Sequence, residues 1–169
     1  LTFLSGDDHR RAVAENRPDL LLSVGRPFEG VELRIDHPDA TGAGELVARA
    51  DHMFRVAADG CLHTGDLARI DDEGYVYLVG RKGDLIIRGG ENVYPAEVEA
   101  VLDEHPAVRE TAVIGVPDDR LGQTVHAVVI PADATNPPSF DELRVFARER
   151  LAGFKVPTSW VLADELPRS

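Results

Sequence analysis

Between residues 80 and 95 the chain reads Gly80-Arg81-Lys82-Gly83-Asp84-Leu85-Ile86-Ile87-Arg88-Gly89-Gly90-Glu91-Asn92-Val93-Tyr94-Pro95. Strand-like runs separated by turn residues precede this stretch, and a helical spacing of apolar residues follows it. Gly83 offers wide backbone freedom where the two patterns meet, so a hinge and an ordinary turn are about equally compatible with it. Gly89 and Gly90 permit a close backbone approach to a ligand just before a helix should begin at Pro95. The stretch therefore predicts two parts of different architecture.

The part before residue 80 is expected to be rich in strands. Runs typical of strands cover residues 31–35, 45–48, 67–70 and 75–79. Between the last two runs lies Asp71-Asp72-Glu73-Gly74, which predicts a β-hairpin because acidic residues ending in glycine favour a tight turn. A short helix around residues 8–14 is the only helix expected before residue 90.

The part after residue 95 alternates helices with strands. The first helix should begin at Pro95 and end before Pro106, since its apolar residues follow a helical spacing. The second helix should open at Ser139, paired with Glu142 in a capping box, and close at Gly153. Strands are expected at residues 111–116, 125–130 and 159–162. The order predicts a small α+β domain of about 85 residues, with a three-stranded sheet, helices and a β-hairpin.

The charge balance and the single cysteine exclude several classes of function. The chain carries 18 Lys and Arg against 30 Asp and Glu, which gives a formal charge of −12. Affinity for DNA or RNA comes largely from basic side chains that neutralise phosphates, so no nucleic acid is expected as a partner. Arg81, Lys82 and Arg88 form a local basic cluster that suits a small anionic ligand. No apolar run approaches the ~20 residues of a membrane helix. Cys61, the only cysteine, excludes internal disulfides and favours a reducing cytoplasm.

Two further segments carry residues with a choice of roles. In Thr64-Gly65-Asp66, the carboxylate of Asp66 either belongs to an ordinary turn or accepts hydrogen bonds from a pair of ribose hydroxyls. Phe154 is more often a core residue than a platform for a base, and Lys155 is more often a solvated charge than a phosphate contact. The six histidines show no metal-ligand spacing, and no nucleophile elbow or P-loop occurs. We therefore expect no metal site and no catalytic group within the chain.

Read together, these segments resemble those of the acyl-adenylate-forming enzymes, which include acyl-CoA synthetases, nonribosomal peptide adenylation domains and beetle luciferases. Residues 60–68 resemble the family motif around Thr-Gly-Asp, and residues 80–99 resemble its Gly-Arg motif that ends in Pro-x-Glu-x-Glu. Shorter pieces agree in the same order: Ser23-Val24-Gly25-Arg26-Pro27, Gly44-Glu45-Leu46, Gly115-Val116-Pro117-Asp118 and Phe154-Lys155-Val156-Pro157. The resemblance runs from about residue 22 to the end and is closest to an acyl-CoA synthetase.

The resemblance implies a domain organisation and a reaction. Residues 1–81 would be the β-rich end of the large AMP-binding domain, and residues 82–169 would be most of the mobile C-terminal domain. In such enzymes a carboxylic acid attacks Mg-ATP to give acyl-AMP, and coenzyme A then displaces AMP. The family's phosphate-binding loop, its acyl pocket and most of its Mg²⁺ contacts would precede Leu1. The adenylation lysine would follow Ser169, shortly after Leu166-Pro167-Arg168, so we expect a C-terminal fragment that is inactive alone.

The same resemblance implies roles for residues at the matching positions. Asp66 would hold the ribose hydroxyls of ATP and AMP, and Arg81 would also contact the nucleotide. Gly83 would be the hinge about which the C-terminal domain swings between the two half-reactions. Family members often carry Asp or Lys at that position, so glycine keeps the flexibility but removes a side-chain latch.

The coenzyme A residues would all lie after the hinge. Gly89, Gly90 and Glu91 would line the pantetheine tunnel, with Gly90 closest to the thiol arm. Phe154 would stack on the adenine of coenzyme A, and Lys155 would lie near its phosphates. These assignments explain why a basic cluster occurs on an acidic chain, since the ligands are anionic.

The expected function is therefore that of an ATP-dependent ligase for a fatty or aryl acid, acting in the cytoplasm. Its partners would be the acid, ATP, coenzyme A and the remainder of its own polypeptide. One alternative is an adenylation domain that loads a carrier protein, although Gly89-Gly90-Glu91-Asn92 is more typical of CoA ligases. The other alternative is a non-catalytic module that binds a nucleotide or a partner protein.

Overall fold

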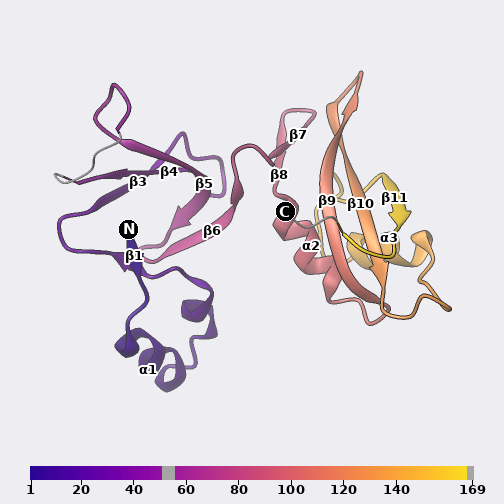
Figure 1. The fold of residues 1–169 in the computed structure, drawn as a ribbon, viewed down its shortest axis with the longest axis horizontal. Helices are drawn as coiled ribbons and strands as arrows, with labels where there is room; N and C mark the ends of the chain where they lie inside the picture. The colour runs from indigo at the N-terminus through magenta and orange to yellow at the C-terminus, as the bar shows by residue number, and fades with distance from the viewer. Residues whose placement is uncertain (51–55, 167–169) are drawn as a thin grey trace. The chain divides into compact units, whose positions relative to one another are not determined.

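The computed structural model describes residues 1–50 and 56–166 and divides by its internal contacts into two compact units. The first unit is Leu1–Gly83 and the second is Asp84–Ser169, so the division falls after Gly83, where the sequence predicted it after Arg81. Figure 1 follows the chain from indigo to yellow through both units. Pro167 and Arg168, which belong to the predicted Leu-Pro-Arg motif, lie outside the described residues. Among the described residues, no helix is both long and apolar enough to cross a membrane.

The first unit is built on a four-stranded antiparallel sheet in the order β3-β4-β5-β6 (Figure 1). These strands are β3 (Glu32–Asp36), β4 (Gly44–Arg49), β5 (Leu62–Ile70) and β6 (Val76–Arg81). A two-stranded antiparallel sheet pairs β1 (Thr2–Phe3) with β2 (Arg26–Pro27). The strands predicted in this part are confirmed, but β5 begins at Leu62 rather than Leu67.

The predicted hairpin between β5 and β6 is confirmed, and Asp71 accounts for its tight turn. The Oδ1 atom of Asp71 accepts hydrogen bonds from the backbone N–H groups of Glu73 (3.0 Å) and Tyr75 (2.9 Å). Gly74 has a φ of +83°, a backbone conformation that glycine adopts without steric cost. The acidic residue and the glycine therefore fix the turn for separate physical reasons.

Two helical segments accompany this sheet. The predicted helix around residues 8–14 is confirmed as α1 (Gly6–Ala14). Ser5 and Asp8 begin it as a capping box, in which each side chain accepts a hydrogen bond from the other residue's backbone N–H. The 3₁₀ helix η1 (Pro18–Leu22) was not predicted, because five residues are too few to show a helical spacing. Buried residues from both segments, from β6 and from the position just before β6 share a small core, formed by Ala12, Leu20, Tyr75 and Tyr77.

The second unit holds a sheet of five strands, which confirms the predicted α+β class. Its strands are β7 (Ile86–Arg88), β8 (Glu91–Val93), β9 (Val108–Asp118), β10 (Gly122–Pro131) and β11 (Ser159–Leu162). Strand β10 lies between β9, which is antiparallel to it, and β11, which is parallel. The hairpin of β7 and β8 joins this three-stranded group through one pair, Gly122 with Arg88.

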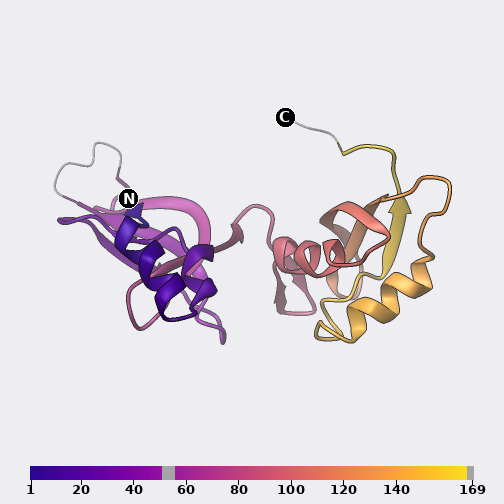
Figure 2. The same cartoon turned by 90° about the horizontal axis from the view of Figure 1, so that it is seen from below.

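Two helices pack on this sheet and close the core of the second unit. They are α2 (Pro95–Asp103) and α3 (Phe140–Arg148), and α3 provides the crossover that parallel strands β10 and β11 require (Figure 2). Their fully buried residues belong to one cluster with residues of the sheet, among them Val98, Leu102, Leu143, Ala147, Val125 and Val129. Both helices were predicted, and both begin at the expected residues.

The end of α3 differs from the prediction. The helix ends at Arg148, with Glu149 as its cap, whereas the sequence predicted that Gly153 would close it. Leu151 nevertheless remains buried, because its N–H donates to the carbonyl of Ala147 (2.8 Å) in a final turn. At the other end, the Ser139 hydroxyl accepts from the N–H of Glu142 (3.2 Å), which is one of the two hydrogen bonds of the predicted capping box.

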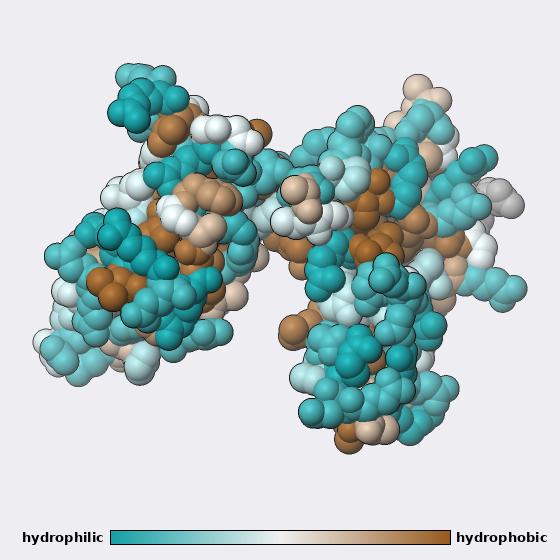
Figure 3. Space-filling view, turned by 180° about the vertical axis from the view of Figure 1, so that it is seen from behind, coloured by the Kyte–Doolittle hydropathy of each residue, from teal (hydrophilic) through white to brown (hydrophobic). Residues whose placement is uncertain are grey.

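The face of each unit that Figure 3 shows is mostly hydrophilic, with hydrophobic patches between the polar areas. Large apolar side chains that remain exposed include Phe3, Leu22, Phe28, Ile87 and Ile114. Phe3 and Phe28 stack on each other with ring centroids 6.0 Å apart, whereas single exposed apolar side chains are ordinary on folded domains.

Candidate functional site

Asp66 and Arg81 lie opposite each other on neighbouring strands of the first unit. They are paired positions in the ladder between β5 and β6. The Nε atom of Arg81 lies 2.8 Å from Oδ1 of Asp66, so the two side chains form an ion pair. The Arg81 side chain is 69% exposed and that of Asp66 is 27% exposed. The structure thus brings together the two residues that the sequence proposed for the nucleotide, at an accessible place.

Thr64-Gly65-Asp66 is part of strand β5, which corrects its interpretation as an ordinary turn. Gly65 has a φ of +75°, and it lies where the register between β4 and β5 shifts, since Glu45 pairs with Leu67 but Val47 pairs with His63. The Thr64 hydroxyl donates to the carbonyl of Leu46 (2.8 Å) and accepts from the N–H of Asp66 (3.1 Å). A bulge of this kind bends the strand and aims a side chain, and such bulges are common near functional sites.

Lys82 and Gly83 follow directly after β6. The backbone N–H of Lys82 donates to the carbonyl of Gly65 (2.9 Å), which continues the pairing of the two strands past Arg81. Gly83 is exposed, and a Cβ atom added to it would meet no heavy atom within 4 Å. Unlike Gly65, it does not have a positive φ. Neither local space nor the backbone conformation therefore requires glycine at position 83.

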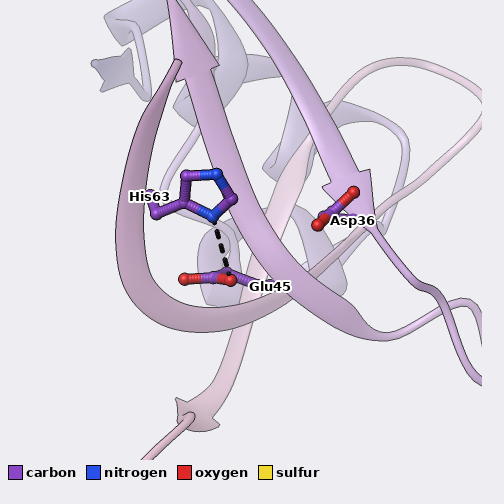
Figure 4. Close-up of side chains that lie close together, drawn as sticks. All are labelled: Asp36, Glu45 and His63. Atoms are coloured by element: carbon purple, nitrogen blue, oxygen red, sulfur yellow. Dashed lines mark hydrogen bonds and ion pairs between the residues drawn. The ribbon is translucent and has the colours of Figure 1, made fainter. Parts of the chain in front are cut away.

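A charged cluster of Glu45, His63 and Lys82 lies beside this ladder, and it was not predicted. Oε2 of Glu45 lies 2.7 Å from Nζ of Lys82. The same oxygen lies 3.1 Å from Nδ1 of His63, the contact that Figure 4 marks with a dashed line. Nε2 of His63 lies 3.2 Å from Oδ2 of Asp59. Only 9% of the Glu45 side chain is exposed. Its carboxylate therefore needs partners, because an isolated charge is costly to remove from water.

The pKa shifts in this cluster agree with its geometry. Lys82 and, to a smaller extent, His63 lower the pKa of the Glu45 carboxyl. Glu45 and then Asp59 raise the pKa of the His63 imidazole above its usual 6.5. Glu45 also raises the pKa of Lys82. Each of these three shifts favours the charged form of the side chain, so the contacts in the cluster stabilise its charges.

Asp36, Glu45 and His63 also form a group whose donor atoms lie within 4.8 Å of one another (Figure 4). The sequence did not predict a metal site from the spacing of its histidines. This group combines donors that several metals accept, but the ammonium of Lys82 already lies on Glu45. The positive charge that these carboxylates require is therefore supplied by the chain itself.

Gly89 and Gly90 form the turn of the hairpin between β7 and β8, and Glu91 begins β8. Their φ values are +61° and +89°, which is the conformation of a tight hairpin turn that favours glycine at both positions. A Cβ atom on Gly89 would come within 3.3 Å of the Leu121 side chain, whereas one on Gly90 would meet nothing within 4 Å. The backbone of Gly90 is therefore accessible within the second unit.

Arg88 joins this hairpin to the segment that contains Phe154 and Lys155. The guanidinium of Arg88 donates to the carbonyl oxygen of Phe154, 66 positions further along the chain. Phe154 is partly buried and packs against the core of the second unit. The structure thus brings the predicted tunnel residues and the predicted nucleotide platform into one neighbourhood within the second unit.

Lys155 is not a solvated charge, as the simpler interpretation of the sequence would have it. Its Nζ atom lies 2.6 and 2.7 Å from the two carboxylate oxygens of Glu97, in the first turn of α2. Only 16% of its side chain is exposed. Nζ also lies 5.7 Å from the centre of the Phe154 ring. Any anion that binds Lys155 must therefore compete with Glu97.

Sequence reasoning missed Glu45, His63 and Glu97 as members of these clusters. Glu45 and Glu97 both lie in segments that carried the family resemblance, which was the available signal. Their partners are 37 and 58 positions away along the chain, so no local spacing could identify the contacts.

Comparisons with known proteins support the relationship that the motifs suggested. Residues 97–169 match the family model of the AMP-binding enzyme C-terminal domain. The chain is 40% identical over 166 residues to a 2-succinylbenzoate–CoA ligase of Bacillus velezensis, an alignment of 89% of the chain and 34% of that ligase. It is 50% identical over 119 residues to a feruloyl-CoA synthase of Amycolatopsis sp, which covers 70% of the chain and 24% of the synthase.

A solved structure agrees with these sequence relatives. The o-succinylbenzoate CoA synthetase of Bacillus subtilis, in complex with its acyl-adenylate intermediate, matches with a TM-score of 0.77 and 37% identity. The match covers 91% of this chain and 34% of that one. The chain thus spans 34% of the length of the 2-succinylbenzoate–CoA ligase and 24% of the feruloyl-CoA synthase.

Proposed function

Since the chain belongs to the acyl-adenylate-forming enzymes, we propose that it is part of an ATP-dependent ligase that joins a carboxylic acid to coenzyme A. The carboxylate would attack the α-phosphate of ATP to give acyl-AMP and pyrophosphate. The thiol of coenzyme A would then attack the acyl carbon and release AMP. Both named relatives act on acids that carry an aromatic ring, so an aryl acid is favoured over a fatty acid as the substrate class.

The observation that carries this proposal is the pairing of Asp66 with Arg81 immediately before Gly83. A carboxylate has two oxygens with about four lone pairs, so the ion pair between Nε of Arg81 and Oδ1 leaves acceptor positions on Asp66. Asp66 can therefore accept hydrogen bonds from the two hydroxyls of a ribose while Arg81 holds its orientation. Hydrogen bonds to a charged group contribute roughly 1.5–3 kcal/mol each. We assign this pair to ATP and AMP.

The second unit supplies the coenzyme A part of the proposal. The turn of Gly89 and Gly90 has no side chains, so a narrow thiol arm could pass close to its backbone, with Glu91 beside it. Arg88 holds Phe154 in the same neighbourhood, where its ring could stack on an adenine. Lys155 would contact a phosphate only after leaving Glu97.

Gly83 separates the two groups of residues, and we propose it as the hinge of the complete enzyme. The division of the chain by contacts falls directly after it, which supports this role. On this basis residues 1–81 would belong to the adenylate-forming domain and residues 82–169 to a mobile C-terminal domain. A rotation about Gly83 would let one reaction centre carry out adenylation first and thioester formation second.

We do not assign Mg²⁺ to the described residues. Among the described residues, the donors that lie closest together are Asp36, Glu45 and His63, and both carboxylates already contact a cation of the chain, Arg34 at Asp36 and Lys82 at Glu45. Mg²⁺ is usually held through substrate phosphates and a few carboxylates, and it would enter such a reaction with ATP. The single buried cysteine, Cys61, agrees with our proposal of a reducing cytoplasm as the compartment.

The test is pyrophosphate release by the full-length enzyme over a panel of aryl and fatty acids, with and without coenzyme A. We expect pyrophosphate release that depends on the acid, and thioester formation only when coenzyme A is present. Acid-dependent pyrophosphate release without a thioester would favour the loading of a carrier protein. Failure of every acid to release pyrophosphate would overturn the proposal in favour of a non-catalytic binding module.

A further inference from the structure

Lys82 is the last residue before the proposed hinge, and it is attached to the first unit by two independent contacts. Its backbone N–H donates to the carbonyl of Gly65 (2.9 Å), and its Nζ donates to Oε2 of Glu45 (2.7 Å). The first contact extends the ladder between β5 and β6, and the second reaches β4. Lys82 is therefore connected to two different strands of the sheet.

The ammonium of Lys82 contacts the carboxylate of Glu45, which is a buried residue. Glu45 lies in the middle of the sheet, since β4 lies between β3 and β5. Nδ1 of His63 lies on the same carboxylate oxygen, and Asp59 contacts the other ring nitrogen of His63. A buried carboxylate that loses one of its partners is strongly penalised, so Glu45 favours the attached position of Lys82.

The attachment ends within one residue. Gly83 has no side chain, a Cβ atom there would meet nothing within 4 Å, and the contact division falls directly after it. Lys82 thus has two contacts with the sheet, whereas its neighbour Gly83 has no side chain to make one. Any rotation should therefore begin at the backbone of Gly83.

We propose that Glu45 and Lys82 are positioning residues that confine the hinge to Gly83 and Asp84. Without this attachment, motion of the second unit would pull on β6 and separate Arg81 from Asp66. With this attachment, the backbone of Lys82 and the residues before it stay in place during rotation. Asp66 and Arg81 then remain paired between β5 and β6. The inference rests on the proposed function only in assuming that the second unit rotates between two half-reactions. The contacts of Lys82 are present in this chain whether or not it does.

The experiment is ¹⁵N relaxation and amide hydrogen exchange on the 169-residue chain. In the wild type, the Lys82 amide should be as ordered as those of β6, with an order parameter near 0.85. The order parameters of Gly83 and Asp84 should be clearly lower. A wild type in which disorder already extends to Arg81 would overturn the proposal.

Lys82→Met and Glu45→Gln test whether the ion pair between these two residues keeps the Lys82 amide ordered. Each should lower exchange protection of the Lys82 amide by about two- to fivefold, in the range expected for a partly exposed ion pair. Disorder should spread to Arg81 in both variants. Lys82→Arg retains the cation and should restore the wild-type order. Arg69→Met is the matched control, because Arg69 is a cation of β5 that lies over Tyr77 and has no contact with Glu45 among the described residues.

The outcomes separate the inference from the proposed function. Unchanged amides in both Lys82→Met and Glu45→Gln would overturn the inference, as would equal effects of Arg69→Met. Retained chemical shifts in β4 and β5 would show that the variants fold, since Lys82 is 63% exposed and its substitution disturbs little packing. None of these measurements depends on ATP, an acid or coenzyme A, so failure of the proposed function would leave the result valid.

Discussion

The two units present their candidate ligand-binding residues by different physical means. In the first unit, Asp66 and Arg81 are held by a strand ladder and by an ion pair across it. In the second unit, Gly89 and Gly90 contribute a backbone conformation, and a hydrogen bond from Arg88 brings Phe154 near it. A substitution in the first unit should therefore remove an interaction and leave the fold intact. A substitution in the second should strain the backbone before it affects a ligand.

Gly83→Pro should have the largest effect, because it acts on the connection between the two units. Proline fixes φ and restricts the residue before it, so rotation at this position should stop. In the complete enzyme we expect thioester formation to be lost and pyrophosphate release to remain, as measured in parallel assays. Gly83→Ala is the control, since its Cβ has space, and it should keep most of both activities. Loss of both steps in Gly83→Pro would indicate misfolding, whereas thioester formation at the wild-type rate would contradict the hinge.

Asp66→Ala tests the first unit directly. It removes at least one charge-assisted contact to ribose, roughly 1.5–3 kcal/mol, so kcat/KM for ATP should fall about 10–100-fold. Steady-state kinetics with ATP as the varied substrate would measure this. Asp72→Ala, an exposed acid in the turn between β5 and β6, should change little. An unchanged kcat/KM for ATP in Asp66→Ala would remove Asp66 from the nucleotide site.

Gly90→Ala tests whether the hairpin turn of the second unit depends on the backbone conformation of glycine. Its φ of +89° is unfavourable for alanine, so the second unit should lose about 1–2 kcal/mol of unfolding free energy. Urea unfolding followed by the fluorescence of Trp160, the only tryptophan, reports on this unit. Gly153→Ala, at a glycine without a positive φ and with open space around it, should stay within about 0.5 kcal/mol of wild type. Equal stabilities of the two variants would contradict the argument from backbone strain.

The larger variant Gly90→Leu tests whether the turn lines the path of coenzyme A. A leucine side chain should obstruct the proposed thiol arm and slow thioester formation, while adenylation continues. If thioester formation proceeds as in the wild type, the turn does not line the path of coenzyme A.

Glu97→Gln should have a smaller effect, because it changes the competition for Lys155. Without the carboxylate, Lys155 should be available to a phosphate, and the KM for coenzyme A should fall about two- to fivefold. The change should shrink at high ionic strength, since salt screens such interactions. Glu104→Gln, an exposed acid just after α2, serves as the control. A KM that stays constant would show that Lys155 serves only to attach its segment to α2.

The smallest effect is expected from the titration of His63, which is partly exposed. Glu45 and Asp59 raise its pKa in the folded chain above 6.5, so protonated His63 stabilises the first unit. This contribution is complete below the unfolded pKa and is lost as pH rises through the folded pKa. The difference in unfolding free energy between wild type and His63→Gln should therefore decrease from pH 6 to pH 9. A difference that increases over this range would contradict the assignment.

Much of the backbone could be predicted because it depends on neighbouring residues. The hairpin turn at Asp71 and Gly74, the helix start at Pro95 and the turn of Gly89 and Gly90 all follow from local conformational preferences. The same reasoning misassigned Thr64-Gly65-Asp66, because three residues with turn preferences were drawn into strand β5 by pairing with β6. It also placed the end of α3 at Gly153 instead of Arg148, since Leu151 continues the apolar spacing although the helix has ended.

The sequence by itself determined the α+β class, the order of elements and the family, because ordered motifs and periodic apolar residues are local properties of the chain. Only the tertiary structure decided which charges meet. Glu45 contacts Lys82 from 37 positions away, and Glu97 contacts Lys155 from 58 positions away. Such pairs depend on strand register and on helix packing, which are set by the whole core of each unit. Lys82 and Lys155 are for this reason both held by carboxylates that the sequence pattern does not connect to them.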